Sequence, residues 1–119
     1  MAGPVRITNQ TRGAVLAERA AIASSWWARG RGLLGRRALP PGEGLIIRPC
    51  NSVHCFFMAF PIDVVYVDRA YRVVRLAPEL RPNRIGPLVL KARDVIELPA
   101  GTVAATGTQV GDQLVVEPA

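Results

Sequence analysis

Short apolar runs separated by glycine and proline constrain the fold of this chain more than any other feature. The 119 residues include 11 glycines and 10 prolines, which form turns and interrupt helices. This pattern favours many short strands over long helices, so the expected fold class is α+β, compact and mostly antiparallel β, with a distorted barrel as one arrangement. The expected strands are Val5–Thr8, Ala14–Ala17, Gly44–Arg48, Val53–Phe57, Asp63–Val67, Arg72–Leu76, Val95–Leu98 and Gln113–Glu117.

One or two short helices complete the predicted fold. In SSWWARGRGLLG, residues 24–35, a serine can cap the start of a helix and Gly35 can end it. In LPAGTVAATG, residues 98–107, Pro99 suits the first helical turn and Gly107 the position after the last turn.

The connections between the strands are predicted from their turn residues. VDRAY, residues 67–71, is typical of a hairpin loop, and the Gly-Asp pair in QVGDQL, residues 109–114, predicts a turn before the last strand. Residues 77–93 contain three prolines and are expected to form an irregular surface loop.

Composition bounds the class of protein. A length of 119 residues predicts a single domain over residues 1–119, and half of the residues are hydrophobic, which is enough for a real core. No run approaches the ~18 apolar residues of a membrane span, and the N-terminus lacks the apolar segment of a secretory signal. We therefore expect a cytoplasmic protein without membrane contact, whose two cysteines are reduced.

The stretch IIRPCNSVHCFFMAFPIDVVYVD, residues 46–68, holds most of the candidate chemistry. The catalytic candidates are Cys50, His54, Cys55 and Asp63. A histidine can lower the pKa of a thiol and so activate it as a nucleophile. The same groups are too few for the four ligands of a typical zinc site, and no Cys-x-x-Cys is present, so neither a metal nor a cofactor is expected. Two small buried thiols in a core are the simpler interpretation.

The aromatic and methionine residues of this stretch indicate ligand binding as an alternative to catalysis. His54, Phe56 and Met58 would share one face of a strand, and with Asp63 they could line an apolar groove for a small molecule or peptide. A carboxylate among Ile and Val must be paired or hydrogen-bonded. Asp63 is therefore expected to cap backbone N–H groups at the start of its strand, or to pair with an arginine.

The net charge of +6 raises the possibility of nucleic-acid binding. The candidate residues are Arg29, Arg31, Arg36 and Arg37, but arginines are spread along the chain, and a solvated basic surface is favoured. GRGLLG, residues 30–35, matches the glycine pattern of dinucleotide-binding sites. Its context does not fit, because RRALPPGEG follows it where a helix is required.

Taken together, several motifs resemble those of domain of unknown function 192, a bacterial and archaeal family. They run from RGLLG through GLII and FFMAFPIDVVYVD to VIELPAGT and GDQLVV. The resemblance implies a compact, mostly β fold with a short helix and no established activity. Many relatives have Lys-Asn-Thr where this chain has only Ala59-Phe60. The matching positions are Gly32, Leu33, Gly35, Gly44, His54, Phe57, Met58, Pro61, Ile62, Asp63, Glu97, Gly101, Gly111 and Asp112.

Three functions remain open from the sequence. The favoured hypothesis is a small binding module with an apolar groove near His54, Met58 and Asp63. The alternatives are an enzyme that depends on cysteine and histidine or on a metal, and a nucleic-acid-binding protein that uses the arginine-rich segment.

Overall fold

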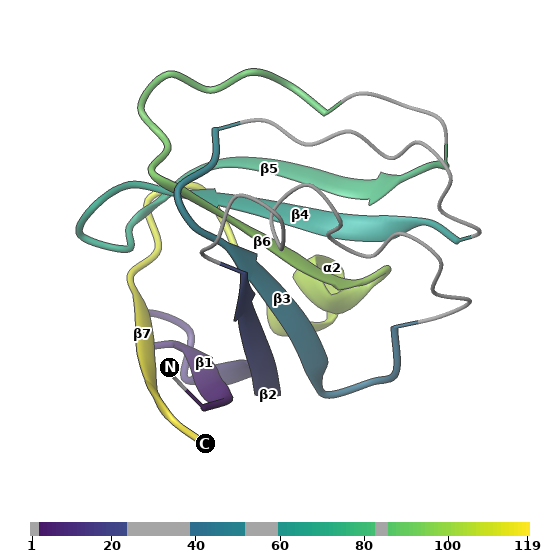
Figure 1. Ribbon diagram of the computed structural model, residues 1–119, viewed down its shortest axis with the longest axis vertical. Coiled ribbons are helices and arrows are strands. Elements are labelled where there is room, and N and C mark those ends of the chain that lie inside the picture. Colours follow the sequence, from purple (N-terminus) through teal and green to yellow (C-terminus); the bar gives the residue numbers. More distant parts are fainter. Residues whose placement is uncertain (1–2, 24–38, 52–59, 83–85) are drawn as a thin grey trace.

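A single curled sheet with one short helix makes up the described part of the chain (Figure 1). The computed structural model describes residues 3–23, 39–51, 60–82 and 86–119. The strand order in the sheet is β5-β4-β6-β3-β2-β1-β7. The elements are β1 (Val5–Asn9), β2 (Ala14–Ala23), β3 (Glu43–Ile47), β4 (Ile62–Val67), β5 (Val73–Leu80), β6 (Asp94–Pro99), α2 (Thr102–Thr106) and β7 (Leu114–Pro118).

The described sheet is mostly antiparallel, as expected, but it is mixed because one of its strand pairs is parallel. Strands β2 and β3 run parallel, from the pair Arg19 and Glu43 to the pair Ala23 and Ile47. The other strand pairs of the described residues are antiparallel. A parallel pair needs a long connection rather than a tight turn, and residues 24–42 supply that length. The composition of the strands themselves does not reveal their direction.

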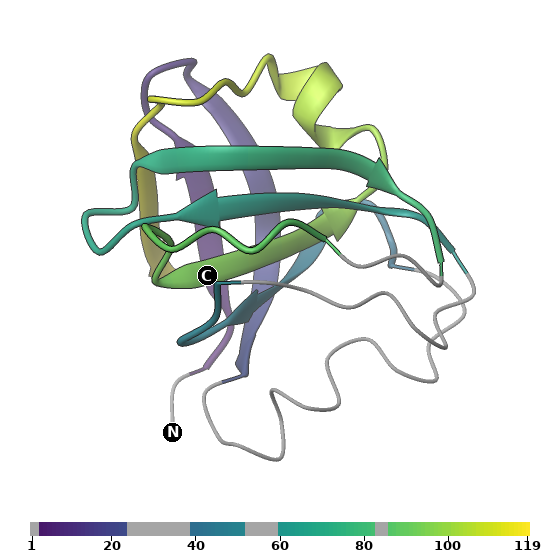
Figure 2. The same cartoon turned by 90° about the horizontal axis from the view of Figure 1, so that it is seen from above.

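The sheet curls into a half-barrel, so that its two edge strands approach each other at one end. Strands β4, β5 and β6 cross over β1, β2 and β7 (Figures 1 and 2). The Val73 N–H donates to the Asp112 carbonyl at 2.9 Å, and the Gly111 N–H donates to the Val73 carbonyl at 2.8 Å. These bonds connect the start of β5 with the turn before β7. The short helix α2 packs beside β2.

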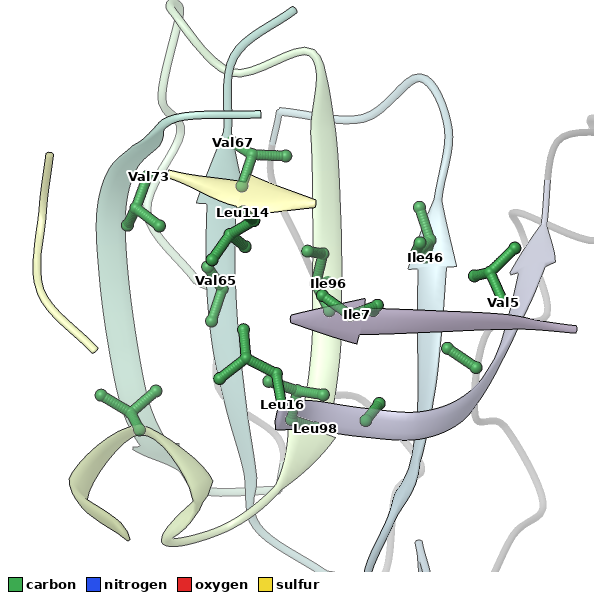
Figure 3. Close-up of a cluster of buried hydrophobic side chains, with 13 residues drawn as sticks. Val5, Ile7, Leu16, Ile46, Val65, Val67, Val73, Ile96, Leu98 and Leu114 are labelled. Atoms are coloured by element: carbon green, nitrogen blue, oxygen red, sulfur yellow. The ribbon is translucent and has the colours of Figure 1, made fainter. Parts of the chain in front are cut away.

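Two hydrophobic cores lie on opposite faces of the central strands. The first core fills the inside of the curl, where Ile7 and Leu114 meet Val65 and Ile96 (Figure 3). The second core covers the other face, which we call the second face. Its buried residues are Ala23, Leu39, Leu45, Ile47, Ile62, Val64, Tyr66 and Val95. All six residues of β4 are buried, because a strand covered on both faces needs apolar side chains at successive positions.

Most of the predicted strands are present, with changes at their ends. β2 extends to Ala23, and β5 extends to Leu80 into the region predicted as a loop. Pro78 is tolerated there because β5 is an edge strand, where a missing N–H breaks no ladder bond. The predicted strand Val53–Phe57 and the predicted helix at residues 24–35 lie outside the described residues.

The second predicted helix is present but begins later than expected. Pro99 ends β6 and is not part of the first turn of α2, which begins at Thr102. Gly107 ends the helix in the left-handed conformation, with φ of 68°, as predicted. The described part of the chain contains no helix that is long and apolar enough to cross a membrane.

Asp63 connects three elements through its buried carboxylate. Its Oδ1 accepts a hydrogen bond from the Glu79 N–H at 2.8 Å, and its Oδ2 accepts one from the Val103 N–H at 2.7 Å. The residue before α2, Gly101, provides no side-chain cap, so Asp63 of β4 caps this helix from a distance. The prediction that Asp63 accepts hydrogen bonds from backbone N–H groups is confirmed, but these groups belong to β5 and α2 and not to the start of its own strand.

Replacing Asp63 with asparagine is expected to lower the free energy of unfolding by about 2 to 4 kcal/mol, because a buried N–H loses its charged acceptor. Urea unfolding at pH 7 measures this difference. Asp68→Asn is the matched control, since the Oδ1 of Asp68 also accepts two backbone N–H bonds, each 2.9 Å long, but in an exposed turn. The control should lose less than about 1 kcal/mol. If both variants lose the same free energy of unfolding, the burial of Asp63 does not strengthen the contribution of its hydrogen bonds to stability.

Candidate functional site

Of the residues proposed as catalytic, ligand-binding or nucleic-acid-binding, only two lie in the described part of the chain. His54, Cys55, Phe56 and Met58 lie within residues 52–59, which are not described. The same holds for the four arginines proposed for nucleic-acid binding, Arg29, Arg31, Arg36 and Arg37. Their predicted roles stay predictions.

Cys50 and Asp63, the two described candidates, lie on different sides of the sheet. Cys50 is half-buried and packs against the second core, and its N–H donates to the Arg93 carbonyl at 2.7 Å. Asp63 alternates along β4 with Ile62 and Val64 of the second core, so its side chain lies on the face of the first core. Within residues 3–23, 39–51, 60–82 and 86–119, no group of three or more His, Cys, Asp or Glu side chains could hold a metal ion.

Glu97 of β6 is the most unusual polar residue of the described structure. It is paired in register with Leu45 of β3 and Val64 of β4, both of which belong to the second core. Its side chain therefore lies on the second face, and only 2% of its surface is exposed. Among the described residues no group donates a hydrogen bond to its Oε1, which is fully buried. A carboxyl group is thus held in an apolar surrounding without the partner that burial normally requires.

Burial raises the pKa of Glu97 from 4.5 to about 7. Removing the group from water disfavours the charged carboxylate, and this loss of hydration is the cause of the raised pKa. At neutral pH the group therefore exchanges between a neutral acid, which can donate a hydrogen bond, and a carboxylate, which can only accept one.

Asp94, at the start of β6, shows how the structure pairs its other buried carboxylates. Its Oδ2 accepts hydrogen bonds from Arg48 Nε at 2.8 Å and from the Tyr71 hydroxyl. Arg93 Nε lies 2.7 Å from Oδ1 as an ion pair, although its N–H is not directed at that oxygen. Burial raises the pKa of Tyr71 to about 12, and its bond to Asp94 acts in the same direction. This cluster ties the hairpin between β4 and β5 to the residues that flank β3 and β6.

Asp112 is the centre of a second polar cluster, where the sheet closes. Arg12 donates to both of its oxygens, at 2.9 and 3.1 Å, and the buried Asn9 side chain donates at 3.0 Å. The Arg12 hydrogen bond holds the pKa of Asp112 at about 2. This interaction stabilises the fold above about pH 4 and is lost as the pH falls toward 2. Asp63, Asp94 and Asp112 thus stabilise the fold, whereas no described residue gives Glu97 Oε1 a hydrogen bond.

The sequence analysis did not select Glu97 as a site residue, although a usable signal is present. DVIELP, residues 94–99, places one carboxylate inside an apolar run, as PIDVV does for Asp63. The two positions look alike in sequence. Only the structure shows that two backbone N–H groups reach Asp63 and that no donor of the described residues reaches Glu97 Oε1.

Glu97→Gln is expected to remove a pH dependence of stability. Below pH 4.5 the carboxyl is protonated in both the folded and the unfolded chain. As the pH rises to about 7, the unfolded chain releases this proton while the folded chain retains it, so the free energy of unfolding falls. The wild type should lose roughly 3 kcal/mol relative to Glu97→Gln over this range. Urea unfolding at several pH values measures the difference, with the exposed Glu117→Gln as control. Parallel curves for wild type and Glu97→Gln would contradict the raised pKa.

Comparison with known proteins places the chain in a family. The model of domain of unknown function 192, described as "Uncharacterized ACR", matches residues 7–116. A UPF0127 protein of Thermococcus sibiricus is 32% identical over 116 residues, which cover 91% of this chain and 72% of that protein. A UPF0127 protein of Pyrococcus horikoshii is 34% identical over 98 residues, with 78% of this chain and 83% of the relative covered.

Two solved structures share the fold. A protein of unknown function from Novosphingobium aromaticivorans has a TM-score of 0.81 and 26% identity, over 94% of this chain and 83% of that one. A putative transcription regulator from Sinorhizobium meliloti has a TM-score of 0.78 over 95% of this chain and 92% of that one. Its 22% identity shows the fold alone. The family model matches nearly the whole sequence, and the chain therefore belongs to the family of domain of unknown function 192.

Proposed function

We propose that this domain is a small-molecule-binding module, and that the second face of its sheet recognises the ligand through the Glu97 carboxyl. The observation that carries the proposal is the fully buried Oε1 of Glu97, which has no hydrogen-bond partner among the described residues. Ligand sites typically combine apolar walls with a few polar groups that fix the orientation of the ligand. Leu45, Val64 and Val95 around Glu97 offer walls of this kind.

A glutamate at position 97 is energetically unfavourable for the fold. A buried polar group without a partner destabilises a fold by about 1 to 3 kcal/mol, and an apolar residue would fit the second core better. Functional sites are where such local costs are commonly found. A bound ligand that hydrogen-bonds to the carboxyl would offset this cost.

The segment that holds His54, Phe56 and Met58 is connected at both ends to the second face. Cys50 precedes the segment and Phe60 follows it, and both pack against the second core. The proposal therefore keeps His54, Phe56 and Met58, which lie outside the described residues, as candidate ligand-binding residues. Asp63 would then contribute as a scaffold, since its two hydrogen bonds hold β4 against α2 and β5.

Glu97→Leu is expected to raise the free energy of unfolding by about 1 to 3 kcal/mol at pH 8, because it replaces an unpartnered acid with an apolar side chain of similar size. Chemical denaturation measures the change. Glu117→Leu on the exposed part of β7 is the matched control and should change stability by less than about 0.5 kcal/mol. A Glu97→Leu variant less stable than the wild type would mean that the glutamate supports the fold, and the energetic argument would fail.

Binding itself is tested with a panel of eight-carbon compounds that differ only in their polar group: 1-octanol, octanamide, octanoate and n-octylamine. Backbone amide shifts of the labelled protein are recorded during each titration. At least one compound should bind saturably and shift the amides of Leu45, Val64 and Val95 on the second face. Ile7 and Leu114 of the first core should shift little. Absence of saturable binding by every compound, or shifts centred on the first core, would overturn the proposal.

A further inference from the structure

We propose that the segment at residues 86–93 docks on the surface of a membrane that contains anionic lipids. This contact goes beyond the proposed ligand site and does not depend on Glu97. Two observations support it. The fold holds two leucines of the segment out of the protein, and the charges that reach the surface of the neighbouring strands and loops are mainly positive.

Leu88 and Leu90 are unusually exposed for large apolar side chains. Leu88 is 65% exposed and Leu90 is 83% exposed, the highest values among the large hydrophobic side chains of the described residues. Leu90 and Lys91 form the centre of a turn, which the Ala92 N–H closes by donating to the Val89 carbonyl at 3.0 Å. Turn centres usually carry Gly, Asn, Asp or Ser, so the turn itself does not explain a leucine there.

Backbone hydrogen bonds and packing hold this turn in place. Val89 and Ala92 pack against the second core. The Val89 N–H donates to the Asn51 carbonyl at 2.8 Å, at the start of the turn. Because Val89 takes the inward position, the two exposed leucines lie on the outer side of the segment, away from β1 and β7 (Figure 1). Leucines presented by a fixed turn lose little conformational entropy when they enter an apolar phase.

Cations reach the surface in excess around this segment. Lys91 forms no ion pair with any residue of the described structure. Arg48 and Arg93 share one carboxylate, that of the buried Asp94, so this cluster keeps a net positive charge. Four further arginines are exposed on β5 or on the loops beside it: Arg69, Arg72, Arg75 and Arg81.

The acidic residues of β3 to β6 and their described connections offset this charge only in part. Three of them are buried, namely Asp63, Asp94 and Glu97. Glu43, at the start of β3, has an interaction partner of its own, as have the titratable Cys50 and Tyr66. Seven cations therefore reach the surface of this region, against the acids Glu43, Asp68 and Glu79. One of the cations, Arg75, is the register partner of Tyr66 on the second face.

A membrane surface matches this combination of groups. Peripheral proteins bind membranes through buried apolar area and through attraction to anionic lipids, to which each nearby Lys or Arg contributes. A nucleic acid would contact the cations but leave the leucines in water. A second copy of this chain, whose net charge is +6, would bring cations against cations. The expectation of no membrane contact rests on the lack of a spanning segment and of a secretory signal, and surface docking requires neither.

Flotation with lipid vesicles tests the proposal on the full chain. Wild type should bind vesicles of phosphatidylcholine and phosphatidylserine at low salt, and more weakly in about 0.5 M salt, which screens exposed charges. Leu88→Ser/Leu90→Ser should lower the partition coefficient about tenfold or more. Its urea midpoint should stay unchanged, because both side chains are exposed. Val110→Ser, in the turn before β7, is the matched control. Val110 is 60% exposed, and this variant should bind as wild type does.

A second pair of variants tests the charges. Lys91→Gln should lower the partition coefficient at low salt about fivefold, and this difference should disappear in about 0.5 M salt. Arg19→Gln removes an exposed cation of β2, which pairs in register with the start of β3, far from the turn. This control should have little effect on binding.

Three results would overturn the proposal. The first is a lack of binding to vesicles that contain phosphatidylserine. The second is equal binding by wild type and Leu88→Ser/Leu90→Ser, which would leave only a basic surface of the kind that a nucleic acid contacts. The third is a wild-type dimer, seen by analytical ultracentrifugation without lipid, that the leucine variant abolishes. That result would assign the two leucines to a contact between copies of the chain.

Discussion

The central strands of this sheet are covered on both faces, and that constraint governs every polar residue that they carry. β4 and β6 lie between a first core inside the curl and a second core on the opposite face. No side chain on these strands reaches bulk water easily, so a carboxylate there must be given a partner or must stay neutral. Asp63 and Glu97 represent these two outcomes on neighbouring strands.

The hydrogen bonds of the two residues differ, and this difference assigns Asp63 to the structural scaffold and Glu97 to the candidate site. Asp63 uses both oxygens to hold the N–H groups of Glu79 and Val103, and so it fixes β5 and α2 relative to β4. Glu97 holds no element in place through its buried Oε1, and burial keeps its pKa near neutrality. The Oε1 of Glu97, which no described residue supplies with a hydrogen bond, is the observation on which we propose a ligand with an apolar body.

Sequence reasoning predicts the local parts of this structure well. The VDRAY loop forms the predicted hairpin, because Asp68 accepts hydrogen bonds from the backbone of Ala70 and Arg72. Gly107 ends α2 as its conformational freedom predicts. The parallel pairing of β2 and β3 was not predicted, since it depends on a long connection rather than on the residues of either strand. Pro78 misled the strand prediction because its position at a sheet edge is a tertiary property.

Sequence reasoning could predict only part of the candidate site, because the role of a buried carboxylate also depends on its tertiary surroundings. A carboxylate in an apolar run marks both Asp63 and Glu97, but the distances to backbone donors decide their roles.

The most direct test of the raised pKa of Glu97 is a carbon-13 NMR titration of the glutamate carboxyl groups in the folded protein, with Glu97→Gln to assign the resonance. A Glu97 carboxyl that titrates near pH 7 would agree with a buried, unpartnered acid. Titration near the ordinary pKa of about 4.3 would show that the group is solvated or paired, and would contradict its role as the recognition group of the second face.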